Sequence, residues 1–182
     1  TSMLGAVPDR YDGDGERVDL ATFFLMARGE GDCPAMEMSK WFDTNYHYLV
    51  PEFHPDQRFR LASTQLLDQV DEALQAGFAA KPVLLGPLTW LKLGKSMVAD
   101  FDPLDHLEAV LPVYEEVLRA LSKKVEWIQM DEPALVLDLS EKEKQAFRAT
   151  YERLTSAAGP ARTLLATYFG SLGENAALAG TS

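Results

Sequence analysis

The sequence predicts an α/β fold in which parallel strands alternate with helices. Two observations support this prediction. Short runs rich in aliphatic, β-branched or aromatic residues, which favour strands, recur four times, at 46–50, 82–85, 127–130 and 163–167. The segments between them carry apolar residues at helical spacing, and each is long enough to connect two parallel strands. Such alternation is typical of a parallel sheet with its helices outside.

The composition fits one globular domain spanning residues 1–182. Hydrophobic residues make up 47% and charged residues 25% of the chain, which is ordinary for a globular protein. The net charge of −11 argues against a nucleic-acid partner, because phosphate binding needs clustered cations. A single cysteine excludes an internal disulfide and indicates a reducing compartment. With no apolar run of membrane-spanning length and no signal-peptide pattern, we expect a cytoplasmic protein without a membrane partner.

Two helices are predicted in the first half of the chain. Residues 18–27 form an apolar segment with Asp19 near its start and Gly29 just beyond its end, which are typical helix boundary residues. A second helix is expected to begin at Ser63, a favourable N-cap residue. Its apolar residues recur on one face until Gly77, which should end it.

Two more helices are predicted in the second half. Residues 104–121 carry the clearest helical stripe, although Pro112 predicts a kink or a break within it. Ser140 and Glu143 match a capping box that starts a helix ending before Gly159. The four strands and their helices make four βα units. Since a closed TIM (β/α)8 barrel has eight such units in about 250 residues, we expect about half of such a barrel.

The densest group of specific residues lies at 35–53, AMEMSKWFDTNYHYLVPEF. Asp43, Thr44 and Asn45 are turn-forming residues placed directly before an aromatic strand. Lys40 and Asn45 supply one cation and one amide close to this turn. The same pattern also fits an ordinary core strand preceded by a solvated loop.

Three segments resemble the cobalamin-independent methionine synthase family. They are MSKWFDTNYHY within 35–53, KPVLLGPLTWLKLGK at 81–95 and WIQMDEPALVLDL at 127–139, and they occur in the family's order. Weaker similarity extends from Leu4 to Phe169, so the resemblance covers nearly the whole chain. It implies a fragment of the family's N-terminal barrel, with the other strands of that barrel and a second, C-terminal barrel lying outside this chain.

The family transfers a methyl group from 5-methyltetrahydropteroyltri-L-glutamate to L-homocysteine and so forms L-methionine. The resemblance implies that zinc in the absent C-terminal barrel activates the homocysteine thiol, because the thiolate is the nucleophile. In this chain Cys33, His47, His54 and His106 lie in unrelated segments without metal-ligand spacing. We therefore expect no catalytic residue, metal or cofactor here, and an inactive fragment. We expect His47 to pack beside its strand and His106 to be solvated.

The resemblance assigns folate binding to Lys40 and Asn45. Lys40 matches a lysine that the family associates with the folate substrate, and Asn45 lies in the same motif. An ammonium group can hold a glutamate carboxylate, while an amide offers a donor and an acceptor to a pterin or amide edge. Alternatively, Lys40 could be a surface lysine lying over Trp41, and Asn45 a turn residue.

Carboxylates follow two of the predicted strands, where barrel enzymes place their sites: Glu52, Asp131 and Glu132. Two carboxylates across a cleft could serve a glycosidase, which is one alternative function. The family repeats the Asp131 motif in its second barrel, where the aspartate is associated with homocysteine. Because this copy belongs to the first barrel, we expect Asp131 to bond neighbouring loop amides instead. A further alternative is a non-catalytic half-barrel that self-associates through its open sheet edges.

Overall fold

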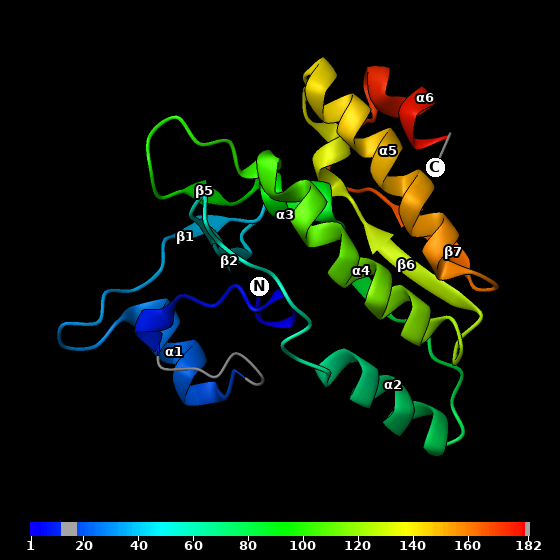
Figure 1. Cartoon of the computed structure of the whole chain (residues 1–182), viewed down its shortest axis with the longest axis horizontal. Helices are drawn as coiled ribbons and strands as arrows, with labels where there is room; N and C mark the ends of the chain where they lie inside the picture. Colours follow the sequence, from blue (N-terminus) through cyan, green and yellow to red (C-terminus); the bar gives the residue numbers. More distant parts are fainter. Residues whose placement is uncertain (12–17, 181–182) are drawn as a thin grey trace.

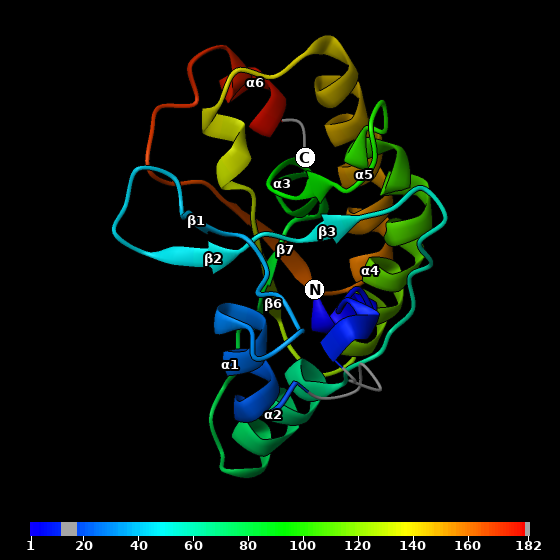
Figure 2. The same cartoon turned by 90° about the vertical axis from the view of Figure 1, so that its left-hand side faces the viewer.

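A parallel three-stranded sheet forms the centre of the fold. The protein is represented by a computed structural model, which describes residues 1–11 and 18–180. The sheet has the order β4-β6-β7, with bounds Val83–Leu85, Trp127–Asp131 and Arg162–Ala166. Helices α4 (Leu107–Leu121) and α5 (Glu141–Ala158) lie together on one side of it (Figures 1 and 2). The predicted α/β class with parallel strands is confirmed, while the described residues form no closed barrel.

The main core lies between this sheet and its two helices. Ile128 and Met130 alternate with half-buried residues along β6 and are fully buried, because side chains of a strand point alternately to its two faces. The same core contains fully buried residues of α3 (Pro87–Lys92), α4 and α5: Leu88, Leu91, Leu111, Leu118, Leu121, Phe147, Tyr151 and Leu154.

The predicted strand at 46–50 is present, but its expected parallel pairing was wrong. Strand β2 (His47–Leu49) pairs antiparallel with β1 (Met38–Lys40) in a separate hairpin. The turn-forming residues reverse the chain within the short loop between them, and a parallel crossover needs a longer connection. Parallel pairing resumes only after Pro51, where β3 (Glu52–Phe53) pairs with β5 (Lys95–Ser96).

The two predicted helices of the first half are confirmed, with one different cap. Helix α1 (Leu20–Arg28) begins directly after Asp19 rather than at residue 18, because the Asp19 carboxylate caps it by accepting a hydrogen bond from the Thr22 amide at 2.7 Å. Helix α2 (Gln65–Gln75) has Thr64 rather than Ser63 at its N-cap. The remaining short elements are η1 (Ser2–Leu4), η2 (Asp9–Tyr11), η3 (Pro103–His106), η4 (Pro133–Val136), η5 (Gly173–Asn175) and α6 (Ala176–Ala179).

Helix α4 runs through Pro112 without a break, so of the expected kink or break, the break is absent. Proline removes one hydrogen bond, here the one to the carbonyl of Glu108, four residues earlier. Both residues lie on the exposed face of the helix, where water can satisfy that carbonyl. The capping box before α5 is confirmed, since the Ser140 hydroxyl and the Glu143 carboxylate each accept a hydrogen bond from the other residue's amide.

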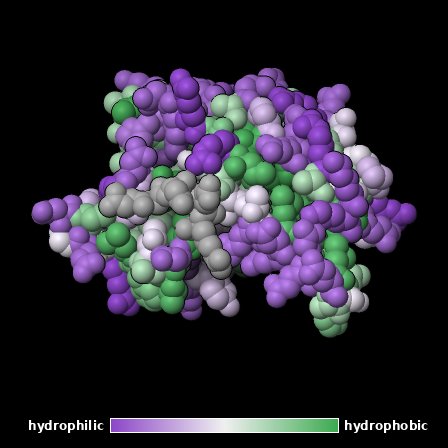
Figure 3. Space-filling view, turned by 60° about the horizontal axis from the view of Figure 1, so that its bottom comes forward, coloured by the Kyte–Doolittle hydropathy of each residue, from purple (hydrophilic) through white to green (hydrophobic). Residues whose placement is uncertain are grey.

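The other face of the main sheet is only partly covered. Val83, Gln129 and Leu164 lie in register across it, and Val83 is 47% and Leu164 39% exposed. Parallel sheets normally have both faces covered. A space-filling view from another side shows further hydrophobic surface between hydrophilic groups (Figure 3). Among the described residues, no helix is both long and apolar enough to cross a membrane.

Candidate functional site

Lys40 and Asn45 both lie at the loop end of the β1–β2 hairpin. Lys40 is the last residue of β1 and lies opposite His47 in the register, while Asn45 belongs to the connecting loop. Both side chains are exposed. Within the ranges 1–11 and 18–180, neither side chain has a hydrogen bond or ion pair with another residue. A cation and an amide are therefore both available to an external group at one end of the hairpin.

The loop that carries Asn45 is internally ordered. The Trp41 amide donates to the Tyr46 carbonyl at 2.7 Å. The Thr44 hydroxyl donates to the Trp41 carbonyl at 2.7 Å and accepts from the Tyr46 amide at 3.1 Å. The Thr44 hydroxyl thus links Trp41 to Tyr46 at the two ends of the loop. Lys40, the last residue of β1, directly precedes Trp41.

Aromatic rings support the hairpin from the rest of the fold. The Trp41 ring meets the Tyr48 ring edge-on, with centroids 5.4 Å apart. The Tyr48 hydroxyl donates to the Leu93 carbonyl at 3.0 Å, which ties β2 to the segment before β5. The structure places Trp41 against Phe42 and Tyr48, and the cation–π contacts of the described residues involve arginines rather than Lys40.

Asp131 ends β6 and bonds side chains rather than the loop amides we expected. Its carboxylate accepts from Gln129 Nε2 at 2.7 Å and from the Tyr168 hydroxyl at 3.1 Å. Burial, followed by the charge of Asp131, raises the pKa of Tyr168 to about 12. Tyr168 is therefore a hydrogen-bond donor at neutral pH, and Asp131 links the end of β6 to the segment after β7.

Glu132, the next residue, is the carboxylate that bonds backbone amides. It is 0% exposed and accepts from the amides of Leu88 and Thr89, at 3.2 and 2.8 Å. The hydroxyls of Thr89 and Tyr151 also donate to it. Burial outweighs these four donors and raises the pKa of Glu132 to about 7. Since no substrate can reach a fully buried carboxylate, its role is to join the start of α3 to the end of β6 and to α5.

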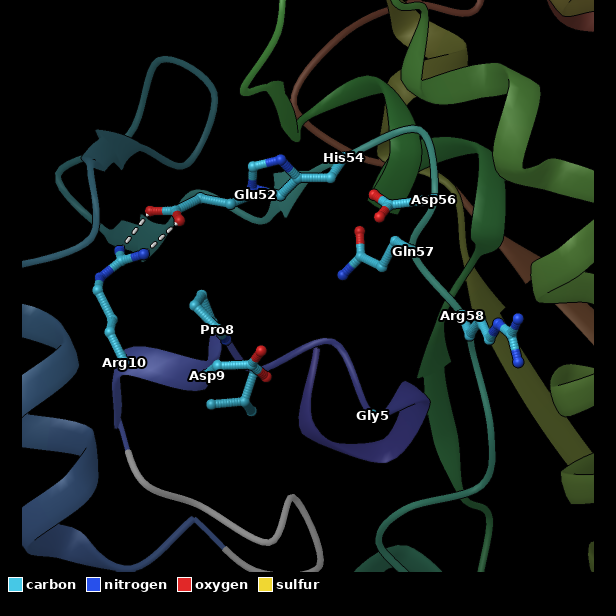
Figure 4. A pocket seen from close by; sticks show the side chains of 10 residues that line it. Gly5, Pro8, Asp9, Arg10, Glu52, His54, Asp56, Gln57 and Arg58 are labelled. Carbon is cyan, nitrogen blue, oxygen red and sulfur yellow. Dashed lines mark hydrogen bonds and ion pairs between the residues drawn. The ribbon is translucent and has the colours of Figure 1, made fainter.

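Glu52 forms a bidentate ion pair with Arg10, at 2.6 and 2.7 Å (Figure 4). The hydrogen bonds to Glu52 raise the pKa of Arg10. No sequence pattern pointed to this partner, because Arg10 lies far from Glu52 along the chain. The pair borders a cavity of about 520 Å³ whose other lining residues are Gly5, Val7, Pro8, Asp9, His54, Asp56, Gln57 and Arg58.

The three carboxylates do not form a glycosidase site. Glu52 borders the cavity just described, whereas Asp131 and Glu132 do not line it. Both oxygens of Glu52 are bonded to Arg10, and Glu132 is buried. A glycosidase needs two carboxylates facing one bond across a cleft, so this geometry does not support the hydrolase alternative.

The described residues do not fit a zinc site. No three His, Cys, Asp or Glu side chains among them converge in a way that could hold a metal ion. His47 lies in β2, as expected, but is exposed. His106 is buried rather than solvated: its Nε2 lies 2.8 Å from the His54 carbonyl, and its ring packs against Phe53 and Phe59. The expectation for His106 was wrong because the phenylalanines that bury its ring come from a distant segment of the sequence.

Comparison with known proteins identifies relatives over almost the whole chain. Residues 1–181 match the family described as "Cobalamin-independent synthase, N-terminal domain". A protein of Syntrophotalea carbinolica named 5-methyltetrahydropteroyltriglutamate–homocysteine methyltransferase is 54% identical over 98% of this chain and 24% of its own length. Proteins of the same name from Parvibaculum lavamentivorans and Nitrosomonas europaea are 51% and 47% identical, over 94% and 98% of this chain and 23% of their own lengths.

The chain thus spans about a quarter of the length of these relatives. The range matched by the family includes all three segments recognised from the sequence, since each of them lies within residues 1–181. The chain belongs to the family of cobalamin-independent synthases and matches their N-terminal domain.

Proposed function

We propose that this chain binds the polyglutamate tail of 5-methyltetrahydropteroyltri-L-glutamate through Lys40, with Asn45 as a second contact. The observation that carries the proposal is the exposed Lys40 ammonium, which has no partner among the described residues and lies at the end of an ordered hairpin. The triglutamate in the names of the relatives supplies a ligand with several carboxylates. A free cation at the end of an ordered hairpin is suited to such an anion.

The contribution of Lys40 can be estimated from its charge. A hydrogen bond that involves a charged group contributes roughly 1.5–3 kcal/mol. The Asn45 amide is neutral and should contribute about 1 kcal/mol. Lys40 is therefore expected to supply most of the binding free energy that these two residues give.

In this proposal, methyl transfer to L-homocysteine takes place in the longer protein. The chain supplies folate binding and scaffold, as about half of a TIM (β/α)8 barrel, and is inactive alone in the cytoplasm. The zinc that would activate the homocysteine thiol would be held by a separate C-terminal domain, because the residues described here offer no site for it. The aligned ends of β4, β6 and β7 support the barrel assignment, since barrel strands run parallel.

Lys40→Ala should weaken binding of 5-methyltetrahydropteroyltri-L-glutamate to the 182-residue chain by roughly 10- to 100-fold, because it removes one charge-assisted hydrogen bond. Isothermal titration calorimetry would measure the dissociation constant. Asn45→Ala should weaken binding about fivefold.

Lys123→Ala is the matched control, because Lys123 is also exposed but lies beyond the end of α4, away from the hairpin. It should leave the dissociation constant unchanged. If Lys40→Ala and Lys123→Ala weakened binding equally, the effect would come from the overall charge of the chain and not from the position of Lys40. Unchanged binding by Lys40→Ala would refute the proposal.

A second candidate function is a non-catalytic module that self-associates. The partly uncovered sheet face with Val83 and Leu164 favours it, as do the open edges β4 and β7. Light scattering should then give a molar mass above 20.2 kDa for the unaltered chain, and a monomer for Leu164→Lys. Phe78→Lys, a change at a 68% exposed residue outside this sheet, should remain associated. A monomeric unaltered chain would exclude this candidate.

A further inference from the structure

Two phenylalanines adopt backbone conformations that bulky residues avoid. Phe42 has φ of 52° and Phe169 has φ of 73°; among the described non-glycine residues, only Asp100 shares a positive φ. For an L-residue this conformation brings Cβ too close to backbone oxygen, and it is strained for a large side chain. Phe42 belongs to the hairpin loop, and Phe169 follows β7.

These two strained residues meet each other. Their ring centroids are 5.8 Å apart, although the residues lie far apart in the sequence. Hydrophobic burial does not account for the contact, because Phe169 is 52% exposed and a half-exposed ring gains only part of its transfer free energy. Backbone strain without a packing explanation is a feature of functional sites, where it fixes a conformation.

A continuous set of contacts joins this pair to the rigid sheet. The Phe169 ring meets the Tyr168 ring edge-on at 4.7 Å, and the Tyr168 hydroxyl donates to Asp131 at the end of β6. In the other direction, the Phe42 ring lies 5.3 Å from the Trp41 ring. Trp41 directly follows Lys40 and closes the loop by bonding Tyr46.

We propose that Phe42 and Phe169 form an aromatic clasp that positions Lys40 for the carboxylates of the polyglutamate tail. This inference rests on the proposed function and deepens it. Neither ring touches the ligand, so both are positioning residues. The clasp holds the hairpin loop against the end of the sheet, so that the ammonium group meets the tail without first ordering the loop. Its effect is therefore confined to ligands with a tail long enough to reach Lys40.

The test compares two ligands and several variants. Phe42→Leu and Phe169→Leu remove one ring each and should weaken binding of 5-methyltetrahydropteroyltri-L-glutamate about fivefold, within the range of coupling energies between contacting residues. Binding of the monoglutamate should not change. Phe42→Tyr keeps the ring and should bind both ligands as the unaltered chain does. Phe78→Leu, at an exposed phenylalanine away from the hairpin, is the control.

A double variant separates positioning from general destabilisation. If the clasp acts through Lys40, Phe42→Leu should cause no further loss of triglutamate binding in the Lys40→Ala background. Amide hydrogen exchange of residues 38–49 should quicken in Phe42→Leu while that of β6 and β7 stays unchanged, which also shows that the variant is folded. Equal weakening of both ligands, a full additional loss in the double variant, or unchanged exchange of residues 38–49 would overturn the clasp.

The outcomes distinguish the clasp from the proposed function. If Lys40→Ala weakens triglutamate binding but Phe42→Leu and Phe169→Leu do not, the proposed function stands and the clasp falls. If Lys40→Ala has no effect, or if the unaltered chain binds no triglutamate, the proposed function falls and the clasp falls with it.

Discussion

Glu132→Ala is expected to lower the free energy of unfolding by about 4 kcal/mol at pH 7, because each buried donor left without a partner costs roughly 1–3 kcal/mol. The variant removes the shared acceptor of two backbone amides, of Leu88 and Thr89, and of two hydroxyls, of Thr89 and Tyr151. The carboxylate is 0% exposed, so water cannot replace it without opening the core. The substitution also removes the cost of burying the Glu132 carboxylate, which offsets part of the loss in stability. Urea denaturation followed by circular dichroism would measure the change.

The pH dependence provides an internal check on Glu132. Burial raises its pKa from 4.5 to about 7 in the folded protein, so the folded state holds the proton more tightly than the unfolded state. The stability that this group contributes is therefore fully present below about pH 4.5 and is lost as the pH rises through about 7. The difference in stability between the unaltered chain and Glu132→Ala should consequently be larger at pH 5 than at pH 8.

Glu116→Ala is a suitable control, because Glu116 is an exposed glutamate of α4. It should change the free energy of unfolding by less than about 0.5 kcal/mol, as is usual for surface substitutions. A loss of under about 1 kcal/mol for Glu132→Ala would contradict the assigned role, since one unpaired donor alone should cost as much.

Features fixed by neighbouring residues could be predicted from the sequence. The Asp19 cap, the Ser140 capping box and the end of α5 before Gly159 each depend on groups within a few residues. The joint position of Lys40 and Asn45 is of the same kind, because the intervening turn residues keep both at one end of a hairpin. Local chemistry therefore sufficed for these helix boundaries and for the closeness of Lys40 and Asn45 along the hairpin.

Features fixed by distant residues could not be predicted. The bidentate partner of Glu52 is Arg10, and the ring against Phe42 belongs to Phe169. The residues next to Glu52 and Phe42 in the sequence do not indicate these distant partners. Asp131 and Glu132 show the same limit, because they are neighbours in the sequence, yet Asp131 bonds side chains whereas Glu132 also bonds backbone amides. The residues that pack around each carboxylate from elsewhere in the chain decided its partners.

Gly94→Ala is expected to destabilise the fold by about 3 kcal/mol, the upper part of the usual cost of overpacking a core. A Cβ at Gly94 would overlap Cε2 of the Phe53 ring. That ring is 0% exposed and packs edge-on against Trp90 at 4.8 Å, so it has no space to move into. The parallel pairing of β3 with β5 forces this approach, because it fixes the segment after Gly94 beside Phe53. Thermal unfolding would show the loss as a lower Tm.

Gly77→Ala separates this overlap from the general effect of replacing glycine. Gly77 has φ of 83°, and no atom lies within 4 Å of the position that a Cβ would occupy there, so its substitution tests backbone strain alone and should cost about 1 kcal/mol. Gly94 has no positive φ, and its cost should come from the collision with Phe53. The double variant Gly94→Ala, Phe53→Leu should therefore lose less stability than the two single variants added together, because the smaller side chain leaves room for the methyl group. Strict additivity would show that Gly94 is required for another reason than its contact with Phe53.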